Sequence, residues 1–208
     1  MAKQTVKPQR PGTQPEINEF RRARLMESTI RLLAEKGVAG ATVRAITGDA
    51  EVSHGLIGHY YATKDDLLVA ALEHLFAGVA TDVAGQIAAA GEDPIARLRA
   101  LPEALFSAAI FTETNRSAFL AFWHEIRFNE AVQRANQALY DGYRERVCGF
   151  FSEAAAYLGQ EIDCESAAIG LIALSDGLWL ELSISAGEVD ADRAAELCHG
   201  FIDTQLKR

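Results

Sequence analysis

Residues 42–68 read TVRAITGDAEVSHGLIGHYYATKDDLL, and this stretch decides the fold. It predicts two short helices, residues 42–50 and 53–61, joined by a tight turn around Val52. Helices at this spacing are typical of a helix-turn-helix, in which the second helix enters the major groove of DNA. The apolar residues able to form the small core between them are Val43, Ala45, Ile46, Ala50, Val52 and Ile57.

Residues of this stretch that lie outside the small core have side chains suited to contact with DNA. The guanidinium group of Arg44 can donate to guanine O6 and N7, and His54 can form a hydrogen bond with a base edge or a phosphate. Leu56 offers apolar surface to a thymine methyl, and Gly58 lets the backbone approach closely. The predicted DNA-binding set, including donors for phosphate oxygens, is Thr42, Arg44, Ser53, His54, Gly55, Leu56, Gly58, His59, Tyr60 and Lys64.

The rest of the chain predicts further helices and no strand. An amphipathic stripe over residues 17–36 precedes Gly37, which favours a helix C-cap. Thr63, followed by Asp66, forms a capping box that opens a fourth helix. Further amphipathic stretches cover residues 95–111, 117–136, 137–158, 164–186 and 191–206. The predicted fold class is all-α, with about nine helices.

Charge divides the chain into a basic head and an acidic body. Residues 1–64 carry 10 Lys and Arg against 6 Asp and Glu, whereas residues 65–208 carry 10 against 23. A basic head suits a protein whose head alone meets phosphates. Residues 1–17 hold three prolines and several basic side chains, and we expect a flexible arm there.

Several classes of protein are disfavoured by composition. The first residues have no apolar segment typical of a signal peptide, and no stretch reaches the roughly 20 apolar residues of a membrane span. We therefore expect a soluble, cytoplasmic protein without a membrane partner. The cysteines, Cys148, Cys164 and Cys198, are few and widely spaced, which favours buried reduced thiols over a zinc site or a disulfide framework.

The stretch from Val52 to Leu68 resembles the reading-helix signature of the TetR family of repressors. It has the Val-Ser pair, Gly55, the aromatic cluster and the Lys that opens the fourth helix. Glu51 departs from the pattern, because the family usually has Gly in this turn, and this departure puts the local turn geometry in doubt. The resemblance covers nearly the whole chain from Arg21.

The resemblance implies an architecture and a function. A three-helix DNA-binding domain is expected over residues 18–64 and a larger ligand-binding and dimerisation domain over residues 65–208. The protein would bind a palindromic DNA operator as a homodimer and be released by a small effector. It would be no enzyme and would need no metal or cofactor.

Downstream segments are similar to the BetI branch of the family, whose members respond to choline or a close relative. They are Ala121-Phe-Trp123, Asp176-Gly-Leu-Trp-Leu180, Val189-Asp-Ala-Asp-Arg193 and Ile202-Asp-Thr-Gln-Leu206. This likeness makes choline, or a related quaternary ammonium compound, the expected effector.

Aromatic residues at helical spacing predict where such a ligand would bind. Aromatic faces beside a carboxylate attract a quaternary ammonium group through cation–π contacts worth about 0.5–2 kcal/mol each. The predicted ligand-binding set is Phe119, Trp123, Glu125, Tyr140, Tyr143, Asp176 and Trp179. Separate packed cores, or a dimer interface around Trp179, are the alternatives.

The last two helices carry small and aliphatic residues suited to packing between two subunits, as the resemblance implies. Burial inside one subunit is the competing explanation. These residues are Ala167, Ala168, Gly170, Leu171, Leu174, Leu178, Leu182, Ala194, Ala195, Leu197, Phe201 and Ile202.

Three rival functions deserve comparison. A regulator of the same architecture could respond to an unrelated apolar ligand. Two Glu-x-x-His motifs, ending at His54 and His199, are of the kind used by di-iron helical bundles. The first straddles the predicted turn, and no inward Glu on further helices completes such a site. A pure protein-interaction bundle would leave the exposed polar set around Arg44 unexplained.

Overall fold

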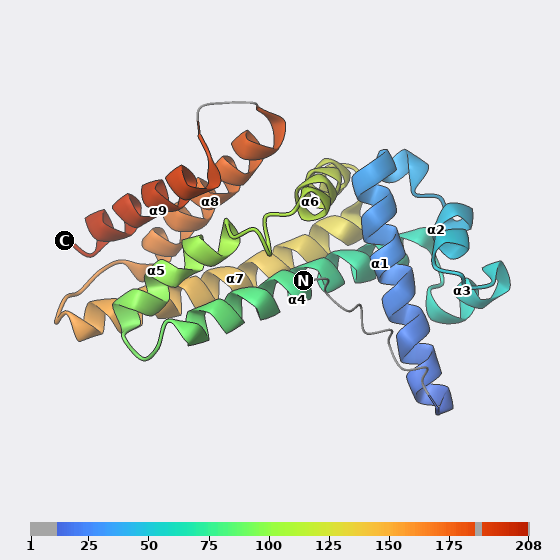
Figure 1. Cartoon of the computed structure of the whole chain (residues 1–208), viewed down its shortest axis with the longest axis horizontal. Coiled ribbons are helices and arrows are strands. Elements are labelled where there is room, and N and C mark those ends of the chain that lie inside the picture. Colours follow the sequence, from blue (N-terminus) through green and yellow to red (C-terminus); the bar gives the residue numbers. More distant parts are fainter. Residues whose placement is uncertain (1–11, 186–188, 208) are drawn as a thin grey trace, which may run out of the picture.

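The computed structural model describes residues 12–185 and 189–207. Residues 1–11 of the arm predicted over residues 1–17 lie outside this range. Within it the chain forms nine α-helices and no strand, which confirms the all-α class. The small head of helices α1–α3 stands at one end of an elongated body made of α4–α9 (Figure 1).

The head is built from α1 (Gln14–Gly40), α2 (Val43–Asp49) and α3 (His54–Tyr60). Helix α1 begins three residues before the predicted start, because Glu16 accepts hydrogen bonds from the backbone N–H groups of Gly12 and Thr13. The last residues assigned to the flexible arm are therefore helical. Gly37, the predicted C-cap, breaks the helical path with a positive φ of 65°, and one further turn carries α1 to Gly40.

The small core between α2 and α3 forms as predicted at its centre. Ile46 and Ala50 are almost wholly buried, and so is Val52 in the turn. Val43, Ala45 and Ile57 are half-buried around them. This packing holds α3 against α2.

The body runs from α4 (Lys64–Ala89) through α5 (Pro94–Leu105), α6 (Glu113–Ile126) and α7 (Glu130–Tyr157) to α8 (Cys164–Ile184) and α9 (Ala191–Gln205). Helices α4 and α7 lie side by side along its length (Figure 1). Helix α4 starts in the head, where Thr63 and Asp66 form the predicted capping box. It thus connects the head with the body without a break.

The end of α6 was predicted ten residues too late, and the start of α7 seven residues too late. Helix α6 ends at Ile126, and α7 begins at Glu130 because Asn129 caps it: its Oδ1 accepts from the N–H groups of Ala131 and Val132. Amphipathic spacing continues through this break and therefore conceals it. Asn129 Nδ2 also donates to Asp65 at the start of α4, at 2.8 Å.

Two helices, α4 and α8, are long and apolar enough to cross a membrane by length and composition alone, contrary to the sequence-based expectation. Each packs against several other helices of the chain: α4 against α1, α5 and α7, and α8 against α6, α7 and α9. Such packing gives a helix of this composition an apolar environment within the protein.

The cysteines correct a second expectation. Cys148 on α7 and Cys164, the first residue of α8, form a disulfide, whereas Cys198 is a free buried thiol. Cys164 lies sixteen positions after Cys148 in the sequence, and the connection between the two helices brings them together. Spacing alone does not reveal this pairing, because it depends on how α7 and α8 pack.

Candidate functional site

Most of the predicted DNA-contacting residues are exposed on the surface of the head. Thr42, Arg44, Ser53, His54, Gly55, Gly58 and His59 are exposed, and Leu56, Tyr60 and Lys64 are half-buried. Helix α3, the second helix of the motif, lies at the outer tip of the molecule (Figure 1). An exposed helix at this position has the geometry needed to enter a major groove.

Several of these side chains are already held within the protein. Thr42 caps α2 by accepting from the N–H of Ala45. The hydroxyl of Tyr60 donates to Asn18 at 3.1 Å, and Lys64 Nζ donates to the carbonyl of Val38 at 3.1 Å. These contacts orient the ends of the motif. Arg44, in contrast, forms no ion pair in the part of the chain that the structure describes.

Glu51 occupies the turn where the family resemblance expects Gly. Its φ is 54°, the left-handed region in which a residue with a Cβ is strained by about 1–2 kcal/mol. Its carboxylate pairs with Arg24 of α1 at 3.0 Å. The geometry of the turn is therefore retained despite the missing Gly. The backbone at Glu51 keeps the conformation that favours Gly, and the ion pair with Arg24 of α1 holds the glutamate in place.

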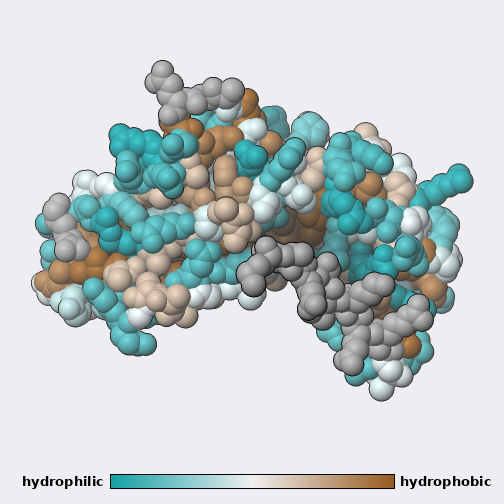
Figure 2. Space-filling model, in the orientation of Figure 1, coloured by the Kyte–Doolittle hydropathy of each residue, from teal (hydrophilic) through white to brown (hydrophobic). Residues whose placement is uncertain are grey.

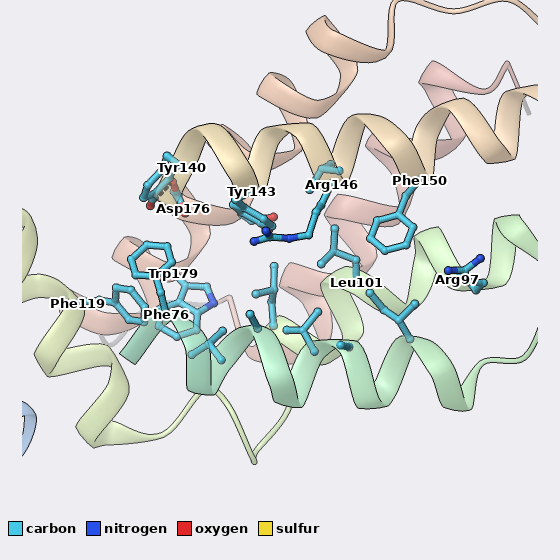
Figure 3. A pocket seen from close by; sticks show the side chains of 18 of the residues that line it. Phe76, Arg97, Leu101, Phe119, Tyr140, Tyr143, Arg146, Phe150, Asp176 and Trp179 are labelled. Carbon is cyan, nitrogen blue, oxygen red and sulfur yellow. Dashed lines mark hydrogen bonds between the residues drawn. The ribbon is translucent and has the colours of Figure 1, made fainter. Parts of the chain in front are cut away.

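The second candidate site is a cavity of about 280 Å³ inside the body. It is lined by residues of α4, α5, α6, α7 and α8, and its wall is mostly apolar (Figure 3). Six of the seven predicted ligand-binding residues line it: Phe119, Trp123, Tyr140, Tyr143, Asp176 and Trp179. Helices far apart in the sequence thus place them around one space.

Glu125, the seventh predicted residue, is not part of the cavity wall. Its carboxylate accepts from Asn129 Nδ2 at 3.2 Å, where α6 passes into α7. The carboxylate that does reach the cavity is Asp176, which accepts from the hydroxyl of Tyr140 at 3.0 Å. One acidic group therefore stands among the aromatic side chains.

Aromatic rings of the cavity wall pack edge to face against one another. Trp179 packs against Phe119 with ring centroids 5.4 Å apart, and Phe76 of α4 packs against both Phe119 and Tyr140. A ring face that no neighbouring ring covers can meet a cation. Trp179 is only 7% exposed, and its indole Nε1 has no hydrogen-bond partner among the described residues.

Burial governs the titration of the polar groups in the cavity. Removal from water raises the pKa of Asp176 to about 6, although the hydrogen bond from Tyr140 lowers it in part. Burial and the nearby Asp176 charge also raise the pKa of Tyr140 and of Tyr143 above the ordinary range. Both phenols are therefore neutral at physiological pH, and Asp176 carries the negative charge of the cavity wall.

Sequence reasoning missed the part of the wall that comes from α4 and α5. Phe76, Val83 and Ile87 of α4 and Leu101 of α5 line the cavity, as do Arg146 and Phe150 of α7. Helix α4 is apolar around most of its circumference, so no periodic signal separates its cavity-facing residues from those in the core. Arg146 reads from the sequence as an ordinary surface arginine.

The residues of the two Glu-x-x-His motifs have structural partners. Glu51 pairs with Arg24, and His199 Nε2 lies 3.0 Å from the carbonyl of Arg99. The first motif lies in the head and the second on α9, at opposite ends of the molecule (Figure 1). The two motifs therefore do not form one metal site.

A helix-turn-helix head joined to a helical body with an internal cavity is the architecture of a transcriptional regulator. Family models agree: residues 25–71 match the bacterial regulatory proteins of the tetR family, and residues 94–207 match the BetI-type transcriptional repressor C-terminal domain. The chain belongs to the TetR family and has a BetI-type C-terminal domain. It is a transcriptional repressor of this type and no enzyme.

Similar proteins support this assignment along the chain. The HTH-type transcriptional regulator BetI of Burkholderia lata is 31% identical over 91% of this chain and 96% of its own length. The corresponding protein of Burkholderia thailandensis is 32% identical over 91% and 95%.

Solved structures share the fold. That of a transcriptional regulator from Pseudomonas aeruginosa PAO1 has a TM-score of 0.82 at 35% identity and covers 91% of this chain and 92% of its own. A regulator from Saccharomonospora viridis, solved in complex with choline, has a TM-score of 0.72 at 23% identity and covers 88% and 95%.

Proposed function

We propose that this cytoplasmic repressor binds an imperfect palindromic DNA operator as a homodimer and leaves it when a quaternary ammonium effector, such as choline, enters the body cavity. The observation that carries the proposal is Asp176, a single carboxylate that lines the same cavity as the rings of Trp179, Phe119 and Tyr140 and accepts a hydrogen bond from Tyr140. A trimethylammonium group cannot use ordinary hydrogen bonds, so it needs negative charge and aromatic faces together. The unpartnered Nε1 of Trp179 can bond an oxygen of the same ligand.

The proposed dimer interface is formed by α8 and α9. One side of α8 exposes Ile169, Leu180 and Ile184, which are 55%, 40% and 65% accessible, and α9 exposes Leu197. Apolar surface is visible at the C-terminal end of α8 (Figure 2). Ala167, Ala168 and Leu171 of α8 are instead buried within the chain. A second copy would cover the exposed side and give two reading helices related by two-fold symmetry.

The helix packing offers a route from effector to operator. Helix α6 carries the cavity residues Phe119 and Trp123, and it packs against α1 of the head. The proposed switch requires the effector to bind more tightly to a body conformation whose heads no longer match the operator. By linkage, the operator must weaken effector binding by the same factor.

A ligand panel tests the proposed effector class. Choline, betaine aldehyde and glycine betaine are added to the wild-type protein in thermal unfolding and operator-release measurements, with neutral apolar compounds as controls. A ligand at 100 times its Kd should stabilise the native state by about 2.7 kcal/mol. Trp123→Ala should abolish both the stabilisation and the release while operator affinity in the absence of ligand is kept. Stabilisation by the neutral compounds alone would instead favour a regulator of apolar ligands, which the largely apolar wall also suits.

Substitution of Arg44 tests how the operator is read. Arg44→Ala should reduce the preference for the operator over unrelated DNA, because a bidentate guanine contact is worth about 1–3 kcal/mol of discrimination. Lys64→Ala should weaken binding to all sequences alike, because a phosphate contact carries no sequence information. Fluorescence anisotropy with operator and scrambled DNA measures both effects. If both variants lost the same affinity for operator DNA as for scrambled DNA, the assigned roles would be contradicted.

A further inference from the structure

The disulfide between Cys148 and Cys164 joins two helices of the cavity wall. Cys148 lies on α7 between Val147 and Phe150, which both line the cavity, and Cys164 is the first residue of α8. Their Cα atoms are 4.9 Å apart, a separation usual for a disulfide. Helix α8 supplies Asp176 to the same cavity. The bond therefore limits how far two helices that both contact the cavity can move apart.

A hydrogen bond links the same two helices at another point. The hydroxyl of Tyr140 on α7 donates to Asp176 on α8 at 3.0 Å. Cys148 lies eight positions after Tyr140, which corresponds to about 12 Å along the helix at ~1.5 Å per residue. The hydrogen bond breaks and forms rapidly, whereas the covalent bond persists until it is reduced. The oxidation state of the cysteines therefore decides whether α7 and α8 are linked at one of these points or at both.

The bonded cysteines are accessible to small oxidants and reductants. Cys148 and Cys164 are each half-buried, whereas the free thiol of Cys198 is wholly buried. Disulfides are rare in the cytosol, and those that form there are usually transient and often sense redox conditions. An accessible pair in a cytoplasmic repressor fits a reversible bond better than a permanent one.

We propose that Cys148 and Cys164 are a reversible oxidation site, whose substrate is hydrogen peroxide and whose disulfide form tightens the cavity. One thiolate attacks a peroxide oxygen, which gives a sulfenic acid and, after protonation, water. The other thiol attacks that sulfur, so the S–S bond forms and a second water leaves. The sulfurs lose two electrons, the peroxide gains them, and a reducing dithiol restores both thiols. This inference takes only the cytoplasmic location from the proposed function and nothing about the effector.

Thiol counting on the full-length protein tests the chemistry. The reduced chain has three thiols that an alkylating reagent labels after unfolding, and brief treatment with hydrogen peroxide should leave only that of Cys198. Dithiothreitol, added to the folded protein, should restore the other two. The oxidised form should have a Tm about 4–16 °C higher, because the bond restricts the unfolded chain. Cys148→Ser and Cys164→Ser should show no such shift.

Tryptophan fluorescence measures the effect on the cavity. The chain has two tryptophans, Trp123 and Trp179, and both line the cavity. Acrylamide should quench them less in the oxidised than in the reduced protein, because the second link limits the separation of α7 and α8. Reduced wild type and Cys148→Ser should be quenched alike. Cys198→Ser keeps the pair and is the control: its oxidised and reduced forms should differ as those of the wild type do.

Three kinds of result would overturn the inference. If peroxide removed no pair of thiols, or if the bond formed between chains, Cys148 and Cys164 would not be an oxidation site within one chain. A disulfide that dithiothreitol could not reduce in the folded protein would be a permanent structural link. Equal quenching of the two forms would separate the site from the cavity. None of these measurements uses an effector or an operator, so each result is distinguishable from a failure of the proposed function.

Discussion

Replacing Asp176 with asparagine is expected to weaken binding of a quaternary ammonium ligand about tenfold or more, equivalent to ~1.4 kcal/mol. The charge of Asp176 lies within the aromatic end of the cavity, and asparagine keeps the shape of the side chain and an oxygen that can accept from Tyr140. The variant should be at least as stable as the wild type at pH 7.5, because an acid whose pKa is raised by burial is destabilised by its own ionisation. Calorimetric titration and thermal unfolding measure the two effects.

The same substitution should remove a pH dependence of effector binding. With its pKa raised to about 6, Asp176 is ionised at pH 7.5 and mostly protonated at pH 5. A cation binds the ionised form, so the wild-type Kd should rise about tenfold as the pH falls from 7.5 to 5. Tyr140 and Tyr143 stay neutral over this range because burial raises the pKa of each phenol. Glu181→Gln, an exposed position on the same helix, should keep the dependence. An unchanged pH profile in Asp176→Asn would contradict the assignment of the charge to Asp176.

Cutting Phe122 back to alanine should lower the free energy of unfolding by about 3–5 kcal/mol. Phe122 lies on α6, is 1% exposed, and belongs to a helix that packs against α1, α7 and α8. For a chain of this size the loss corresponds to a fall in Tm of about 6–20 °C. Phe128, six residues later and 72% exposed, is the matched control. Phe128→Ala should change stability by no more than about 0.5 kcal/mol. Equal effects in the two variants would show that α6 is not packed as described.

The head could be predicted closely because its information is local. Cap residues, turn residues and the short apolar pattern around Ile46 act within a few positions of one another. The body was harder, since periodicity identifies helices but not their ends. Asn129 ends one helix and caps the next without interrupting the apolar spacing, so the break was assigned to the wrong place.

The candidate ligand site illustrates the same limit. Aromatic spacing on α6 and α7 and the Asp176–Trp179 pair identified six cavity residues, because chemistry and helix face could be read together. Glu125, which was grouped with them, does not line the cavity, and its carboxylate accepts from Asn129 instead. Phe76 and Arg146 were missed because only tertiary packing brings α4 and the middle of α7 to the same cavity. Helix α8 is apolar on most sides, and its buried and exposed faces could not be told apart in the sequence.

The contact between α6 and α1 bears on the design of hybrid regulators. The cavity takes no residue from α1, α2 or α3, so under the proposed function effector preference and operator preference would reside in separate sets of side chains. Exchanging the head between relatives is thus an obvious way to connect this sensor to a different promoter. The junction between α1 and α6 belongs to both parts, however, and a graft that changes only one of its surfaces would give a protein that senses without responding. A working hybrid must carry over, with its new head, the α6 residues that face α1.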